Sequence, residues 1–145
     1  MKRVDPEITL HEEAFIEYFV QKQRRERLLF ELRKHRGRFL GRLTHGALEC
    51  LDLRFATALP PPNSDPAAIL RLLEARGAGK TCYAISSNDQ IDGRILPLSD
   101  ALYAAVGFGM PSILSCCPGL LAYVETEQVA GPPDRYFLTR KPSVT

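Results

Sequence analysis

Hydrophobic residues near the start of the chain form two groups separated by a polar run. One group lies within residues 15–20 and the other within residues 28–32, whereas residues 22–27 are all polar. A helix that faces a core normally has an apolar residue every three or four positions. The interruption therefore predicts a helix whose middle is solvated or packs against something outside the domain.

Helix signals bracket the two apolar groups. Thr9 and Glu12 have the spacing of a capping box, in which two side chains satisfy amides of the first helical turn. Acidic residues precede basic ones along this stretch, which is the order that the helix dipole favours. Gly37 is a typical residue for a helix end. We therefore expect one long helix from Thr9 to about Lys34.

The second half of the chain has shorter apolar runs separated by turn residues. Asp65 and Pro66 are typical of a helix start, and residues 97–106 have the pattern of another short helix. Pro118–Gly119 fits a type II turn, because glycine tolerates the positive φ that this turn requires. Residues 38–59 fit either a strand or a short helix. Strands are predicted at 81–85, 112–116, 120–124 and 135–139.

The order of these elements predicts an α+β fold: a long N-terminal helix plus a small, mostly antiparallel sheet with two further helices. We expect a single domain over residues 1–145, with an N-terminal helical segment at 9–36 and a compact α+β part at about 65–140. No apolar run has the length of a membrane span, and the four cysteines form no recognisable disulfide framework. These features predict a soluble, cytoplasmic protein with reduced thiols and no membrane partner.

Charge is distributed very unevenly along the chain. Residues 22–42 contain nine basic residues against two acidic ones, a formal charge of +7, whereas the whole chain carries +2. A concentrated basic surface attracts acidic proteins and polyanions. We therefore expect a non-enzymatic binding or adaptor protein that docks on an acidic or anionic partner through Lys22, Arg24, Arg25, Arg27, Arg33, Lys34 and Arg36.

Other interpretations of the basic run stay open. Nucleic acid is one possible partner, because phosphate contacts release counterions and the rings of Phe30 and Phe39 are suited to stacking on bases. The remainder of the chain is formally −5, which would suit self-association into a homo-oligomer. The same charges also match the helix dipole and would then simply be solvated. We rank an acidic protein surface or self-association above nucleic acid.

The most chemically suggestive segment is Ser115–Gly119. Two neighbouring thiols beside a turn would suit a small thiol-dependent enzyme, with Ser115 or a remote histidine as helper. However, no base lies nearby in the sequence, and alternate residues of a strand face opposite sides of a sheet. Burial as small hydrophobic side chains is therefore the preferred interpretation of Cys116 and Cys117.

Other motifs do not meet the spacing that their chemistry requires. Gly79–Lys80–Thr81 is similar to the end of a phosphate-binding loop, but position 74 is Glu and a helix precedes the motif. Zinc-binding spacings of cysteine and histidine are absent, and His11 is expected at the surface of the first helical turn. We expect no metal and no cofactor. Four carboxylates would lie close together only if the strands beside them were neighbours in the sheet: Asp89, Asp92, Glu125 and Glu127.

Overall fold

Six antiparallel strands form one sheet at the centre of the structure. The structure is a computed structural model that describes residues 5–60, 63–127 and 134–140, except for the side chains of residues 43–49. The order across the sheet is β1-β6-β5-β4-β2-β3, with antiparallel pairing throughout. The strands are β1 (Ala56–Ala58), β2 (Thr81–Ser86), β3 (Ile95–Pro97), β4 (Ser112–Cys117), β5 (Leu121–Glu125) and β6 (Arg135–Thr139).

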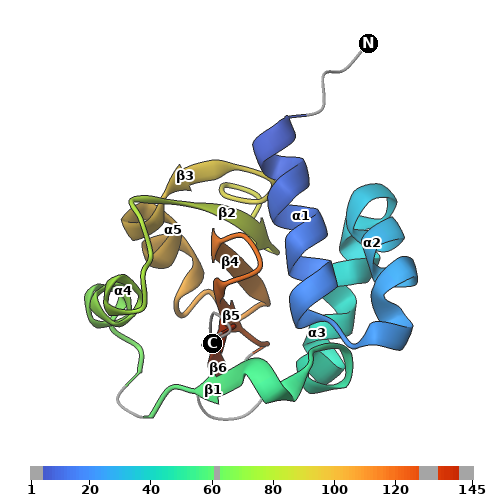
Figure 1. The fold of residues 1–145 in the computed structure, drawn as a ribbon. Coiled ribbons are helices and arrows are strands. Elements are labelled where there is room, and N and C mark those ends of the chain that lie inside the picture. Colours follow the sequence, from blue (N-terminus) through green and yellow to red (C-terminus); the bar gives the residue numbers. More distant parts are fainter. Residues whose placement is uncertain (1–4, 61–62, 128–133, 141–145) are drawn as a thin grey trace, which may run out of the picture.

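Helices pack on both faces of this sheet. Helices α1, α2 and α3 lie together beside one face, and α4 and α5 lie on the other side (Figure 1). This arrangement confirms the predicted α+β class, including the mostly antiparallel sheet. The α-helices are α1 (Pro6–Phe19), α2 (Arg25–Lys34), α3 (Arg36–Cys50), α4 (Pro66–Ala75) and α5 (Leu98–Ala105), with short 3-10 turns η1 (Lys22–Arg24) and η2 (Leu53–Phe55).

Alternating strand residues build a separate hydrophobic core on each face of the sheet. On β2, Tyr83 and Ile85 belong to the core under α1–α3, whereas Cys82 and Ala84 belong to the core under α4 and α5. Successive side chains of a strand point to opposite faces, so a strand covered on both sides is apolar at nearly every position. This double burial explains why the central strands appear in the sequence as continuous apolar runs.

The N-terminal helix differs from the prediction at both ends. The carboxylate of Asp5 accepts a hydrogen bond from the Glu7 amide at 2.8 Å, and Pro6 occupies the first helical position. Thr9 therefore lies inside the helix and does not cap it. The helix is 14 residues long and ends at Phe19, well before the predicted end at Lys34.

Contacts with the segment that follows α3 stop this helix. Val20 forms an isolated antiparallel β-bridge with Leu51, and the Asp52 amide donates to the Phe19 carbonyl at 2.8 Å. These contacts hold the backbone at the helix end in an extended conformation. The polar run at 22–27 therefore consists of the η1 turn between two helices and the first residues of α2, which explains the gap in the apolar stripe.

The ambiguous segment and the predicted stop at Gly37 also have a clear outcome. Helix α2 ends at Lys34 with His35 as its C-terminal cap, and Gly37 lies inside α3. Residues 38–59 therefore contribute most of helix α3, then η2 and the short strand β1. Among the described residues, no helix is both long enough and apolar enough to cross a lipid bilayer.

Candidate functional site

Helix α2 presents one side to solvent at the outer edge of the helical layer (Figure 1). Its Leu28 and Leu32 side chains point inward and are almost fully buried. Arg27, Phe30 and Lys34 are spaced three and four residues apart, so they share the opposite side, and all three are exposed. Phe30 retains 55% of its accessible surface, so its ring is accessible to a partner between Arg27 and Lys34.

Several cations on α2 and on the segments just before and after it have no carboxylate partner among the described residues. We define the α2 basic face as the ring of Phe30 together with Lys22, Arg24, Arg27, Lys34 and Arg38. Within the described parts of the chain, only Arg27 of these cations forms an ion pair, at 3.4 Å from Glu31, and its side chain is still 72% exposed. The face thus combines available positive charge with an exposed aromatic ring.

Two of the predicted docking residues, Arg25 and Arg33, lie on α2 and contact other parts of the chain. The Nε of Arg25 donates to the Val20 carbonyl at 3.0 Å and so satisfies an acceptor at the end of α1. Arg33 lies 3.1 Å from a carboxylate oxygen of Glu13 on α1. These contacts tie α2 to α1, which reduces the part that either cation can take in docking.

Arg36 is the centre of a polar cluster that joins α1, α3 and β2. Its Nε lies within 2.9 Å of both carboxylate oxygens of Asp92, and its Nη1 donates to Glu12 at 3.2 Å. Its Nη2 donates to the Tyr83 hydroxyl at 2.8 Å, and that hydroxyl donates to Glu12 at 2.7 Å. Burial raises the pKa of the Tyr83 hydroxyl, which keeps it protonated as a donor. The structure thus gives Arg36 an internal role.

The carboxylates of Asp92 and Glu125 do not come together. Asp92 lies in the Arg36 cluster, whereas Glu125 is fully buried and lies 2.7 Å from the Nε of Arg135. The two carboxylates therefore serve different cations in different places. In the parts of the chain that the structure describes, no group of three or more His, Cys, Asp and Glu side chains is arranged to hold a metal ion.

A β-bulge brings the two neighbouring thiols to the same face of the sheet. The pairing of β4 with β5 shifts between Ser115 and Cys117, and both Cys116 and Cys117 pack with the core under α4 and α5. The expectation that they face opposite sides is therefore wrong. Burial raises the pKa of both thiols, and Cys117 Sγ donates to the Gly77 carbonyl at 3.4 Å. A raised pKa leaves little thiolate, which favours packing over nucleophilic chemistry.

Ser115 faces the other core and contacts His11, so the prediction that this histidine lies at the surface is wrong. His11 Nδ1 and Ser115 Oγ are 2.7 Å apart, and both residues are buried. Burial lowers the pKa of His11, so the ring is neutral at neutral pH. One signal in the sequence is the spacing of His11 from Phe15 and Phe19, which places all three on one helix face.

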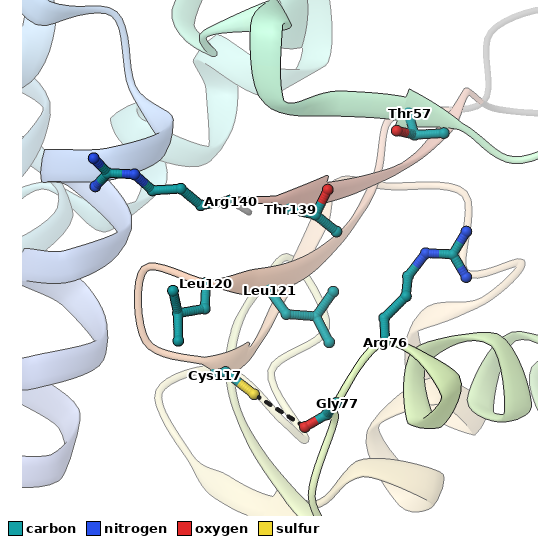
Figure 2. A pocket seen from close by; sticks show the side chains of 8 residues that line it. All are labelled: Thr57, Arg76, Gly77, Cys117, Leu120, Leu121, Thr139 and Arg140. Carbon is teal, nitrogen blue, oxygen red and sulfur yellow. Dashed lines mark hydrogen bonds between the residues drawn. The ribbon is translucent and has the colours of Figure 1, made fainter. Parts of the chain in front are cut away.

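Three of the open cavities at the surface of the described chain are lined by one or more of the candidate residues. One of about 630 Å³ lies between α1 and α2 beside Glu12, and one of about 340 Å³ lies between Arg36 and the Ser87–Asp89 loop. The third, of about 520 Å³, lies near the turn between β4 and β5 (Figure 2). Neither His11 nor Cys116 lines any of these three cavities.

The chain matches no protein-family model, and searches among curated proteins and among solved structures return no similar protein.

Proposed function

We propose that this protein is a non-enzymatic binding or adaptor protein that docks on an acidic protein surface through the α2 basic face. The observation that carries this proposal is the exposed ring of Phe30 on α2 between Arg27 and Lys34, with further cations on the adjoining segments that have no carboxylate partner among the described residues. Arginine and aromatic side chains are enriched in protein interfaces. A partner that presents carboxylates around an apolar pocket would match both features.

A protein partner agrees with this face better than nucleic acid does. Phe39 is only 3% exposed, so one of the two rings suited to base stacking is inaccessible. Glu26 is exposed on the same helix and would repel a phosphate backbone. The sequence pI is about 8.4, whereas nucleic-acid-binding domains commonly exceed about 9. A reducing compartment such as the cytoplasm fits the four cysteines, which form no disulfide among the described residues.

The test compares two variants with the same change of net charge. R27E/K34E/R38E reverses the α2 basic face, whereas R71E/K80E/R94E reverses three exposed cations elsewhere. The probe is a short fluorescent peptide rich in glutamate with one central tryptophan, measured by fluorescence anisotropy. We expect the first variant to bind the peptide at least about tenfold more weakly than the wild type, or ~1.4 kcal/mol, and the second to bind almost normally.

Two further arms of the experiment separate the competing partners. Added salt should weaken peptide binding, because contacts between exposed charges are screened. Single-stranded DNA that binds more tightly than the peptide would overturn the protein-partner proposal in favour of nucleic acid. Light scattering at two ionic strengths tests a second copy of the chain as the acidic partner, and a dimer lost only in R27E/K34E/R38E would identify it.

A further inference from the structure

One corner of the sheet face that α4 and α5 cover is left open as a cavity of about 520 Å³ (Figure 2). It lies where β1, β6, the β4–β5 turn and the end of α4 meet, and it shares no residue with the α2 basic face. Cavities of this size are typical of small-molecule sites. The lining residues are Thr57, Arg76, Gly77, Cys117, Leu120, Leu121, Thr139 and Arg140.

The cavity combines an apolar part with unused hydroxyl groups. Leu121 is buried, whereas Leu120 is 52% exposed. Leu121 is paired with Thr139 across β5 and β6, and Thr57 is paired with Phe137 across β1 and β6, so these side chains share one face of the sheet. Neither threonine hydroxyl forms a hydrogen bond with a described residue. They are therefore available to a ligand.

Arg76 supplies an uncompensated positive charge beside these hydroxyls. Its guanidinium lies 4.5 Å from the centre of the Phe137 ring, and its Nη1 donates to the Leu72 carbonyl at 3.1 Å. Within the described chain it forms no ion pair, and no carboxylate lines the cavity. Stacking on an aromatic ring orients a guanidinium without neutralising it.

Arg140 contributes to the cavity in a different way. Figure 2 shows its side chain directed away from Arg76, and its guanidinium lies 4.1 Å from the centre of the Tyr18 ring on α1. Its stem therefore forms part of the wall, and its charge adds to the positive potential of the site. It does not reach the group that Arg76 faces.

We propose that this cavity binds a small amphiphile with a carboxylate head and an apolar body. The carboxylate lies against the Arg76 guanidinium and accepts a hydrogen bond from Thr57 or Thr139, and the apolar body covers Leu120 and Leu121. Planar guanidinium groups match carboxylates geometrically, which supports this choice of head group. This binding function is additional to docking through α2.

The test uses decanoate, with decanol as the uncharged comparison, and isothermal titration calorimetry of the full chain. R76Q should weaken decanoate binding by about tenfold, whereas R71Q, which changes an exposed arginine outside the cavity, should leave it unchanged. Decanol should bind the wild type more weakly than decanoate does. On R76Q, which lacks the guanidinium, decanol and decanoate should bind equally. Equal decanoate affinities of wild type and R76Q, or no binding of decanoate, would overturn the proposal.

Labelling of Cys117 gives a second readout that does not depend on a variant. This thiol lines the cavity and is the most accessible of the four cysteines. Decanoate at saturation should slow its modification by N-ethylmaleimide, as followed by peptide mass spectrometry. Unchanged labelling at saturation would mean that the ligand binds elsewhere and would overturn the proposed site. Either result is independent of the peptide-binding experiment on α2.

Discussion

Glu125 shows how single buried charges are accommodated in this protein. Its carboxylate is fully buried and accepts hydrogen bonds from Arg135 Nε at 2.7 Å, from the Tyr123 hydroxyl at 2.7 Å and from the Gly107 amide at 3.0 Å. A buried charge is tolerated only when it is paired and hydrogen-bonded. Removing one partner leaves the other charge buried without compensation.

We therefore expect E125A to lower the free energy of unfolding by about 3–5 kcal/mol. Urea denaturation followed by circular dichroism measures this loss. E17A removes an exposed carboxylate on α1 and should change stability by no more than about 0.5 kcal/mol. A cost for E125A similar to that for E17A would contradict the structural role of the Glu125–Arg135 pair.

Gly119 is a second position where a single substitution should have a specific structural effect, because an added Cβ would meet α1. Its φ is +72°, and an added Cβ would lie 2.5 Å from Cδ2 of Tyr18 on α1. Gly107 has a similar φ of +80° but open space where its Cβ would lie. The two glycines therefore separate the cost of backbone conformation from the cost of a steric clash.

G107A should destabilise the protein by about 1–2 kcal/mol, since alanine at positive φ is strained. G119A should add an overpacking cost of about 1–3 kcal/mol to that strain. Thermal or urea unfolding of the two variants measures the difference. Equal losses of stability in G107A and G119A would show that the β4–β5 turn does not pack against α1 as described. The substitution Y18A should reduce the extra destabilisation of G119A and leave that of G107A unchanged.

Among the helices, α1 is attached to the sheet by a contact that depends on pH. His11 is buried against Ser115, and burial lowers the pKa of its ring below the ordinary value of 6.5. As pH falls below 6.5, the unfolded chain therefore binds a proton before the folded chain does. The contribution of neutral His11 is complete above that pH and is lost as pH decreases towards its lowered pKa.

The urea midpoint should therefore decrease between neutral pH and mildly acidic pH, with part of the decrease due to His11. H11Q keeps a hydrogen-bonding group but cannot titrate, so its midpoint should change less over the same range. The measurement is a series of urea titrations at several pH values for both proteins. Identical pH profiles would exclude protonation of His11 as a source of the decrease.

Helix starts and ends that depend on neighbouring residues could be predicted from the sequence. Those that depend on contacts between distant parts of the chain could not. The start of α4 was predicted because Asp65 caps its own helix, with a hydrogen bond of 3.0 Å from the Ala67 amide. The end of α1 was not, because it depends on the bridge from Val20 to Leu51. The bulge at Cys116 also depends on the register with β5, which spacing alone does not reveal.

At the scale of the whole molecule, the basic run divides into an internal part and an external part. Arg36 joins the helical layer to the sheet through Asp92, Glu12 and Tyr83, whereas Lys34, two residues earlier, is exposed. The sequence showed the total charge but not this division, because the partners of Arg36 come from α1, β2 and the loop after β2. Charge density along the sequence therefore does not separate the cations with internal partners from the exposed ones.

This division predicts opposite effects of two similar substitutions. R36Q should lower the free energy of unfolding by about 1–3 kcal/mol, because it removes charged hydrogen bonds from a partly buried cluster. K34Q should leave stability nearly unchanged and instead weaken binding of the acidic peptide. Urea denaturation and anisotropy on both variants supply the four values, and a stability loss larger for K34Q than for R36Q would refute the division.

We expect the position of the cations on and beside α2, and not the net charge of the chain, to determine binding of an acidic partner. The most direct measurement is the ratio of peptide affinities of R71E/K80E/R94E and R27E/K34E/R38E, since both variants have the same net charge. The variant with an intact α2 basic face should bind the peptide at least about tenfold more tightly. A ratio near one, with both proteins folded, would contradict it.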